Sequence, residues 1–457
     1  MNITNVVDAQ KQYFKTGATL PISFRLAALK KLRKEITAQE NAICEALHLD
    51  FKKPYFEAVI TETSIILKEL DEFISNLKSW SKTEKVTSSL LNFPSSAYIY
   101  KEPYGNTLVI SPWNYPFQLA IAPLIGAVAA GNTVILKPSE LTPHTANILS
   151  SIIAKVFDKG HVTVVQGDKN VSQELLSKVW DYVFFTGSVR VGTIVAKACA
   201  EHLTPVTLEL GGKNPCIVHE SAKIATTARR LVWGKFINAG QTCIAPDYIL
   251  VHASIKKVLV TALKKEIEAF YGSDPEQSPD FARISHKGNF ERLSKMLKDS
   301  KLICGGTTNE EDLYISPTLL DEPALNSNAM ETEIFGPILP IISYTTEEDI
   351  HKYVSHYHKP LSFYVFAEQK AFADKLLKKY SFGGGVKNDS IVHFVNKNLP
   401  FGGVGQSGMG AYHGKRSFET FSHKKSVVKR GTWIDIPLKY APYKNKLKWI
   451  KSVLKWT

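Results

Sequence analysis

The stretch NTLVISPWNYPF, residues 106–117, decides the fold of this 457-residue chain. Its first six residues are typical of a short buried strand, and Pro112 and Pro116 then fix the backbone of a polar turn. The same order of apolar strand and polar end recurs in TVILKPSE (133–140), TVVQGD (163–168), YVFFTGS (182–188) and VTLELGG (206–212). Helical patterns separate these segments, which predicts an α/β fold with a parallel sheet between two layers of helices. Because parallel sheets bind ligands beyond the carboxyl ends of their strands, these polar ends predict a cofactor crevice.

The sequence on either side extends this pattern. Residues 24–48 and 56–80 have helical spacing, and residues 97–101 alternate like a strand. After residue 212, a second series of strands predicts a second α/β domain: NPCIV (214–218), YILVH (248–252), ILPIISY (338–344) and LSFYVFA (361–367). A late strand within residues 418–429 pairs, on this hypothesis, with 97–101 in a small projecting sheet.

Length and composition narrow the class of protein. A chain of 457 residues is too long for one core, so two or three domains are expected. The five cysteines are scattered without a CxxC pair, which predicts no disulfide framework, no metal site and a reducing compartment. The first residues lack a signal-peptide pattern, and the longest apolar stretch, 119–131, is too short to span a bilayer, so a cytoplasmic protein is expected. The net charge of +13 is compatible with nucleic acid or anionic membrane partners, but the lysines are spread along the chain, which favours simple solubility.

Three residues are candidates for catalysis. Cys243 lies in FINAGQTCIAPD (236–247) between two turn sequences, and we expect it to open a helix whose N-terminus lowers the thiol pKa; the alternative is a buried, inert cysteine. Glu209 ends a predicted strand before two glycines and can act as a general base, or be a salt-bridged rim residue. Asn114, held between two prolines, can donate to an oxyanion, or simply cap a turn.

Strand ends also supply candidates for cofactor binding. Lys137 and Glu140 follow a strand, where a cation and an anion suit a pair of sugar hydroxyls, and the residues between them are expected to start a helix. Gly187 and Ser188 begin GSVRVG (187–192), whose amides can approach a pyrophosphate at a helix N-terminus. Because this is not the GxGxxG pattern, an ordinary strand-to-helix turn is an equal alternative.

Two further segments contribute aromatic candidates. In ETEIFGP (331–337), Glu333 can hold a ribose and Phe335 can flank a flat ring; the alternative is a charged loop over a core phenylalanine. PFGGVGQSGMG (400–410) contains five glycines, so it is neither a regular helix nor a strand. Phe401 can then line the mouth of a pocket, unless the segment is only a linker.

In this order and spacing, the motifs resemble those of the aldehyde dehydrogenase superfamily. The resemblance runs from SPWNYPF through GNTVILKPSE, FTGS, LELGGKNP, FINAGQTCIAPD and ETEIFGP to PFGGVGQSGMG. The segments GQTCIAPDY and GMGAYHGKRSFETFSHKKSV, together with the short N-terminus, look like the class 3 branch, which includes fatty-aldehyde enzymes.

The resemblance implies a domain organisation. It implies a Rossmann-like NAD-binding domain (1–82 and 103–211), a catalytic domain (212–410), and a small oligomerisation sheet (83–102 and 411–432). Residues 433–457 then form a basic tail in which Leu447, Ile450 and Leu454 recur at helical spacing. This tail is a candidate for peripheral membrane contact, with docking on a partner subunit or at the substrate mouth as the alternative. A homodimer is expected from class 3 and from the prevalence of twofold assemblies.

The resemblance also implies residue roles. Cys243 matches the nucleophile, Glu209 the general base and Asn114 the oxyanion donor. The cofactor contacts of the family are matched by Lys137, Glu140, Gly187, Ser188, Glu333 and Phe335. Its substrate-pocket residues are matched by Trp233, Tyr115 and Phe401. The implied reaction is oxidation of an apolar medium- or long-chain or aromatic aldehyde to its acid through a thiohemiacetal and a thioester. A carboxylate near the ribose, Glu140, favours NAD, with NADP also accepted in class 3.

Two other functions are compatible with parts of the sequence. A cysteine hydrolase would also carry a glutamine near a reactive cysteine, but it needs a histidine partner that no motif supplies. A basic nucleic-acid-binding protein would explain the charge, but no nucleic-acid-binding motif is present.

Overall fold

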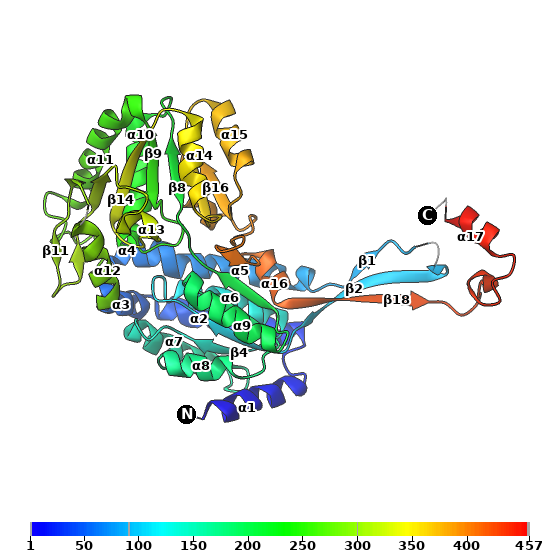
Figure 1. The fold of residues 1–457 in the computed structure, drawn as a ribbon. Helices are drawn as coiled ribbons and strands as arrows, with labels where there is room; N and C mark the ends of the chain where they lie inside the picture. Colours follow the sequence, from blue (N-terminus) through cyan, green and yellow to red (C-terminus); the bar gives the residue numbers. More distant parts are fainter. Residues whose placement is uncertain (1, 90–91, 299, 455–457) are drawn as a thin grey trace.

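A computed structural model describes residues 2–89, 92–298 and 300–454 of the chain. Two α/β units lie one above the other in Figure 1, and a narrow sheet projects from their junction. The N-terminus lies beneath the lower unit, and the C-terminal segment lies at the far end of the projection. The α/β fold expected from the strand and helix pattern is therefore present, with parallel strands at the centre of each unit.

The lower unit is built on a sheet whose strands run in the order β17 (Gly408–Met409), β7 (Val206–Glu209), β6 (Tyr182–Thr186), β3 (Asn106–Ile110), β4 (Thr133–Lys137) and β5 (Val162–Val164). All neighbours are parallel except β17, which pairs antiparallel with β7. Every residue of β3, β4 and β6 is buried, because helices cover both faces of a parallel sheet. The helices that follow its strands are α6 (Gln118–Ala130), α7 (Pro143–Val156), α8 (Lys169–Leu176) and α9 (Val189–Glu201).

The N-terminal helices pack around this sheet. They are α1 (Ile3–Lys15), α2 (Ile22–Ala38), α3 (Glu40–Phe51), α4 (Tyr55–Ala58), the π-helical turn η1 (Val59–Thr63) and α5 (Ser64–Trp80). The helix expected over 24–48 is thus broken at Gln39, whose φ and ψ are −104° and 8°. The helix expected over 56–80 carries the π-helical turn within it. The helix expected directly after Lys137 begins instead at Pro143, after a turn.

The upper unit contains the second sheet, with strands in the order β10 (Leu302–Cys304), β13 (Thr318–Asp321), β14 (Ile338–Tyr344), β9 (Tyr248–His252), β8 (Pro215–Val218), β15 (Ser362–Phe366) and β16 (Gly384–Lys387). β10 is antiparallel to β13, and the other neighbours are parallel. Its helices are α10 (Ile224–Phe236), α11 (Lys256–Tyr271), α12 (Lys287–Lys298), α13 (Asn328–Glu331), α14 (Glu347–His356) and α15 (Lys370–Lys379). A hairpin of β11 (Thr308–Asn309) and β12 (Tyr314–Ile315) lies beside it, and short 3₁₀ turns are η3 (Ile237–Gly240), η4 (Ala253–Ile255) and η5 (Val392–Val395).

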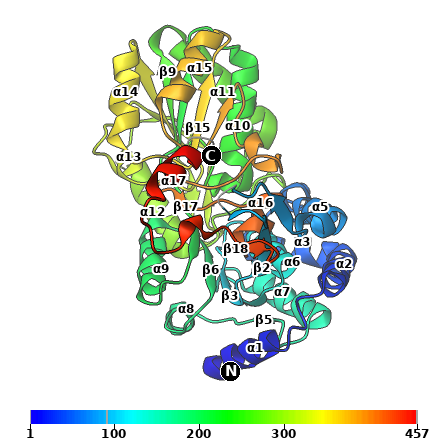
Figure 2. The ribbon, with the colours of Figure 1, turned by 90° about the vertical axis from the view of Figure 1, so that its right-hand side faces the viewer.

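The projecting sheet is antiparallel, in the order β1 (Glu84–Val86), β2 (Ser95–Pro103) and β18 (Ser422–Arg430). The predicted pairing of 97–101 with a late strand is confirmed, although the strand starts at Ser422 because α16 (Lys415–Thr420) precedes it. Beyond β18 the chain forms the 3₁₀ turn η6 (Pro437–Lys439) and α17 (Leu447–Val453), which Figure 2 shows in front of the molecule.

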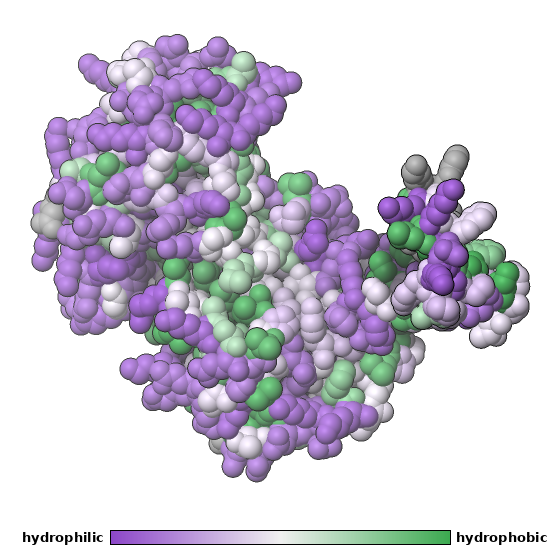
Figure 3. All heavy atoms as spheres, turned by 45° about the vertical axis from the view of Figure 1, so that its right-hand side comes forward, coloured by the Kyte–Doolittle hydropathy of each residue, from purple (hydrophilic) through white to green (hydrophobic). Residues whose placement is uncertain are grey.

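The tail after β18 exposes large apolar side chains. Trp433 is 73% exposed, Tyr443 is 70% exposed and Trp449 is 69% exposed. Figure 3 shows hydrophobic and hydrophilic residues mixed on this projecting arm, away from the body. Within residues 2–89, 92–298 and 300–454, no helix has the length and apolar composition needed to cross a membrane. The predicted tail helix is present over Leu447–Val453, and residues 455–457 lie outside the described residues.

Candidate active site

Two cavities of opposite character meet between the two units. One, of about 290 Å³, is a channel lined mainly by apolar side chains, including Trp233, Phe394 and Phe401. The other, of about 780 Å³, is a polar cleft beyond the carboxyl ends of β3, β6 and β7. The residues that line both cavities are Leu119, Thr186, Glu209, Leu210 and Cys243. Cys243 and Glu209, the predicted nucleophile and general base, therefore lie at the junction, where the two cavities meet.

An unusual backbone carries Cys243 to this junction. Asn238, Ala239 and Gly240 have consecutive left-handed φ angles of 56°, 51° and 72°. A Cβ at Gly240 would collide with the carbonyl oxygen of Gly336, so only glycine fits the last of these positions. The Asn238 side chain donates to the Asn114 and Gln241 carbonyl oxygens, at 2.8 Å and 3.2 Å, which stabilises the conformation.

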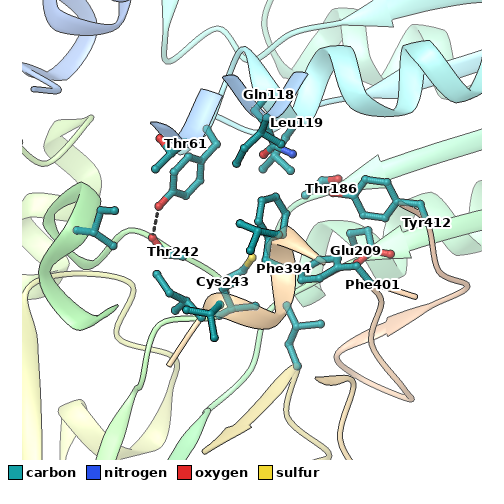
Figure 4. Close-up of a pocket in the computed structure, with 18 of the residues that line it drawn as sticks. Thr61, Gln118, Leu119, Thr186, Glu209, Thr242, Cys243, Phe394, Phe401 and Tyr412 are labelled. Carbon is teal, nitrogen blue, oxygen red and sulfur yellow. Dashed lines mark hydrogen bonds between the residues drawn. The ribbon is translucent and has the colours of Figure 1, made fainter. Parts of the chain in front are cut away.

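Side chains from the upper sheet fix the rest of the cysteine loop. The Asn214 amide, at the start of β8, donates to the Cys243 and Ala245 carbonyl oxygens at 2.8 Å and 3.0 Å. The Tyr364 hydroxyl donates to the Ile244 carbonyl oxygen at 2.5 Å. The loop is therefore held by hydrogen bonds on both sides of the cysteine, and Figure 4 shows the Cys243 sulfur directed into the channel between Thr242 and Phe394.

The environment of the thiol differs from the prediction. No helix begins at Cys243: η3 ends at Gly240, and the next regular element is β9. A helix N-terminus therefore does not lower the pKa; burial, and then the nearby Glu333 and Glu209 carboxyl groups, raise the pKa of the thiol above its usual range. The thiol is protonated at neutral pH in this environment and needs a base. The full burial expected of a core cysteine is also not found, because the residue is partly exposed and lines both cavities.

Glu209 lies where a carboxyl group keeps its proton until a ligand binds. It ends β7 and is 2% exposed, and within the described residues neither carboxylate oxygen has a hydrogen-bond partner. Burial raises its pKa well above the usual range. The rim salt bridge considered for it is absent from the part of the chain that the structure describes. A buried carboxyl group without a partner is costly to stability, which makes Glu209 a candidate for a functional role.

Asn114 lies in the cleft on the turn between β3 and α6. Its side-chain nitrogen donates to the Gln241 carbonyl oxygen at 3.0 Å, and the residue is 4% exposed. Since a carboxamide has two N–H groups, one remains for a ligand oxygen. The amide is thus tied to the loop that carries Cys243, which is the arrangement an oxyanion donor requires.

The polar cleft brings together four of the predicted cofactor residues. Gly187, Ser188, Glu333 and Phe335 all line it. Ser188 caps α9 through its side chain, which accepts from the Val191 amide at 3.4 Å. The α9 N-terminus therefore faces the cleft, which suits an anionic pyrophosphate.

The chemistry of the cleft fits a dinucleotide. Burial raises the pKa of Glu333 to about 8, and its carboxylate lies so close to Gly211 that a Cβ there would collide with it. Phe335 packs edge-on against Trp113, with ring centroids 5.2 Å apart. A carboxyl group beside glycine backbone and an aromatic pair are the groups expected around a ribose and a flat ring.

Lys137 and Glu140 lie apart from the residues that line the cleft. Lys137 is buried and forms an ion pair with Glu140, at 3.2 Å, while the Glu140 side chain is 42% exposed. Glu140 lines a separate hollow of about 360 Å³ together with Gln166, Gly167 and Asp168, at the carboxyl ends of β4 and β5.

The channel contains the three predicted substrate residues, Tyr115, Trp233 and Phe401. Tyr115 hydrogen-bonds through its hydroxyl to the Thr242 hydroxyl at 2.6 Å, the dashed line in Figure 4. Phe401 comes from the glycine-rich segment, and in Figure 4 it lies with Phe394 and Glu209 around the same space.

Sequence reasoning missed a buried ion pair beside the cleft. Lys213 and Asp247 are both 4% exposed at their side chains, and their charged atoms are 2.5 Å apart. Asp247 also accepts from the Ile334 amide at 2.9 Å, so the pair supports the segment that carries Glu333. The sequence signal for this pair was the position of Lys213, directly after the two glycines that follow a strand. A lysine is seldom fully buried without a partner, so a buried lysine at this position implies a nearby acidic group.

Comparison with known proteins defines the class of this protein. The aldehyde dehydrogenase family pattern matches residues 1–427, and the chain belongs to that family. It is 48% identical, over 97% of both chains, to the 4,4'-diaponeurosporen-aldehyde dehydrogenase of Staphylococcus aureus, and 43% identical, over 94% of this chain and 95% of the other, to the dimeric NADP-preferring aldehyde dehydrogenase of Mus musculus. A substrate-bound structure of Staphylococcus aureus AldH superposes with a TM-score of 0.97 and 47% identity, over 99% of this chain and 100% of the other.

These matches confirm the resemblance and the predicted activity. The protein is an oxidoreductase that oxidises aldehydes with NAD or NADP. The hydrolase and nucleic-acid-binding alternatives receive no support from them.

Proposed function

We propose that Cys243 is the nucleophile of this aldehyde dehydrogenase, Glu209 its general base and Asn114 its oxyanion donor, and that the substrates are apolar aldehydes. The observation that carries this proposal is the junction: Cys243 and Glu209 line both the apolar channel and the polar cleft. An aldehyde that reaches the Cys243 sulfur through the channel therefore has its carbonyl group next to the cleft. The arrangement supplies a nucleophile and a base where two different ligands meet.

The first step is addition of the sulfur to the aldehyde carbon. Because burial keeps the thiol protonated, its proton must leave as the S–C bond forms, and it passes to solvent through the cleft that Cys243 lines. The free N–H of the Asn114 amide and the Cys243 backbone amide donate to the oxygen as it becomes negative. The product of this step is a thiohemiacetal on Cys243.

The second half of the reaction releases the acid. When the dinucleotide is bound, its nicotinamide ring supplies the acceptor for the hydride that converts the thiohemiacetal to a thioester. Glu209, after losing its proton to solvent through the cleft, takes a proton from water, which attacks the thioester carbon. The acid leaves and the Cys243 thiol is restored.

The channel supports the choice of apolar aldehydes. Its wall is formed mainly by aliphatic and aromatic side chains from α5, α6, α10, η5 and the glycine-rich segment. Such a wall binds a hydrocarbon chain by removing apolar surface from water and rejects charged groups, which would lose their hydration. The Staphylococcus aureus relative acts, by its name, on 4,4'-diaponeurosporen-aldehyde.

The hollow that contains Glu140 supports a preference for NAD. An exposed carboxylate at the ends of β4 and β5 accepts hydrogen bonds from ribose hydroxyls and repels a 2′-phosphate. The mouse relative is NADP-preferring by name, so this preference distinguishes members of the family. In this proposal, residues 1–82 and 103–211 bind the dinucleotide, with Lys137 and Glu140 at its sugar, and residues 212–410 carry catalysis.

The projecting sheet, residues 83–102 and 411–432, is proposed to join two copies in a homodimer. Strand β18 lies at the edge of its sheet, and seven of its nine residues are exposed. An open edge of this length is a template for pairing with another chain. Light scattering on the purified protein should give a dimer; a monomer would contradict this assignment.

For the tail, residues 433–457, we propose peripheral contact with anionic membrane, because aromatic side chains and lysines are exposed on it together. Sedimentation with anionic vesicles should pellet the full protein and leave a variant truncated after residue 432 in solution. Equal pelleting of both would reject membrane contact and favour docking of the tail on a partner copy.

The enzymatic proposal is tested by NADH production over straight-chain aldehydes of graded length. We expect kcat/KM to rise with chain length until the channel is filled, and activity to be absent from Cys243→Ala. A flat profile, or the highest activity with charged aldehydes, would contradict the substrate assignment.

A further inference from the structure

A buried ion pair lies behind the turn that carries Asn114. Lys53, in the link between α3 and α4, and Glu62, in the π-helical turn η1, are both fully buried, with their charged atoms 2.8 Å apart. Neither lines the channel or the cleft. Two buried charges cost stability through lost hydration, so their presence so close to the site calls for an explanation other than stability alone.

Glu62 fixes the end of the turn that bears Asn114 and Tyr115. Its second carboxylate oxygen accepts from the Phe117 and Gln118 amides, at 3.1 Å and 2.8 Å. These amides begin α6, which has no cap from its own N-cap side chain. A carboxylate at this place satisfies free N–H groups and complements the helix dipole. The π-helical turn, a feature that is frequent at functional sites, is what carries Glu62.

Lys53 reaches the same turn from its other side. Its ammonium group lies 4.1 Å from the centre of the Tyr115 ring, a cation–π contact in a site without water access. The Tyr115 hydroxyl is hydrogen-bonded to Thr242, the residue before Cys243. The pair therefore contacts the oxyanion turn directly and the cysteine loop through Tyr115.

The same N-terminal segment also holds the cysteine loop directly. Glu57, five residues before Glu62, accepts from the Asn238 amide at 2.9 Å. Asn238 in turn donates to the Asn114 carbonyl oxygen. Residues 53–62 thus contact both loops whose relative position sets the distance from the sulfur to the Asn114 amide.

We propose that Lys53 and Glu62 are positioning residues for aldehyde oxidation, which hold the Asn114 amide at the oxygen of the Cys243 adduct. The inference rests on the oxyanion role proposed for Asn114. A small displacement of a catalytic group lowers the reaction rate strongly, since a shift of about 1 Å lowers the rate by about a hundredfold. Replacing both charges, rather than one, avoids leaving an uncompensated buried ion.

The test is a double-mutant cycle on the whole enzyme. Lys53→Met/Glu62→Gln keeps side-chain size and one acceptor for the α6 amides, and should lower kcat by about tenfold to a hundredfold while the KM for NAD stays within about twofold. In an Asn114→Ala background the same replacement should lower kcat by less than about twofold, because the group it positions is gone. The matched control is the exposed pair Arg33–Asp71, as Arg33→Met/Asp71→Asn, which should leave kcat unchanged.

Unchanged kcat in the first variant, or an equal loss in both backgrounds, would overturn the proposal. If the double variant does not fold, Lys53→Arg/Glu62→Asp, which keeps both charges but moves them, is measured in the same cycle, with the same criteria. Failure of the proposed function would be seen separately, as parent protein whose NADH production does not depend on Cys243.

Discussion

The channel and the cleft differ in nearly every physical respect, although they share part of their walls. The channel is formed largely by aliphatic and aromatic side chains, whereas the cleft collects charged residues, glycines and a helix N-terminus. The first suits a hydrocarbon chain, and the second suits a charged dinucleotide. In the proposed mechanism, each ligand is recognised in its own cavity, and the reaction takes place at the residues where the cavities meet.

The shared wall also explains the electrostatics of the site. Cys243 and Glu209 lie deep between the two units, so burial is the largest influence on the pKa of each, and it raises both. A neutral thiol and a neutral carboxyl group are stable in such a place until a ligand arrives. We therefore expect binding of the two ligands to precede loss of either proton.

The largest effect is expected at the junction. Cys243→Ala should lower aldehyde oxidation by about 10⁴-fold or more, since no other group can form the covalent adduct. Because the cleft is otherwise intact, NADH should bind with unchanged Kd, measured by its fluorescence. Residual oxidation at a tenth of the parent rate would place the nucleophile elsewhere.

The raised thiol pKa predicts a strong pH dependence of alkylation in the cofactor-free enzyme. The thiolate is the reactive form, and below a raised pKa its fraction grows about tenfold per pH unit. The rate of Cys243 alkylation by iodoacetamide should therefore rise about a hundredfold from pH 7 to 9 without a plateau. A plateau below pH 7 would show that the thiol is already ionised.

Matched variants on either side of the junction separate the two cavities. Trp233→Ala removes a wall of the channel and should lower kcat/KM for a long-chain aldehyde by about ten- to a hundredfold, with little effect on a short one. Phe335→Ala, in the cleft, should weaken NADH binding and change all aldehydes equally. If both variants alter chain-length selectivity, the cavities are not separate in function.

The smallest effect is expected at the far hollow. Removing the charge in Glu140→Gln should raise kcat/KM for NADP by about fivefold, the size of one screened charge repulsion near the surface. Selectivity among aldehydes should not change. A parent enzyme that already prefers NADP strongly would contradict the role given to this carboxylate.

The sequence was most informative where burial is uniform. Strands β3, β4 and β6 were located within a residue or two, because runs buried on both faces are apolar throughout. The proposed catalytic residues were predicted from ordered motifs, since Cys243, Glu209 and Asn114 come from segments far apart in the chain. Taken alone, each of these three residues could equally have a structural role: a buried cysteine, a salt-bridged rim residue or a turn cap.

What the sequence did not reveal depends on backbone detail and on pairing in space. The left-handed conformations of Asn238 and Ala239, a few residues before Cys243, depend on hydrogen bonds to distant residues. Lys53 and Lys213 look like surface charges in sequence, because lysine is seldom fully buried. Their partners, Glu62 and Asp247, are brought to them only by the fold.

The thioester itself offers the most direct test of the claim that Cys243 and Glu209 act together at the junction. In Glu209→Gln, mixed with NAD and a long-chain aldehyde, oxidation should stop after one NADH per subunit because water is no longer activated. Mass spectrometry of the quenched protein should then find the acyl group on Cys243. Steady turnover with Cys243 unmodified would contradict the account.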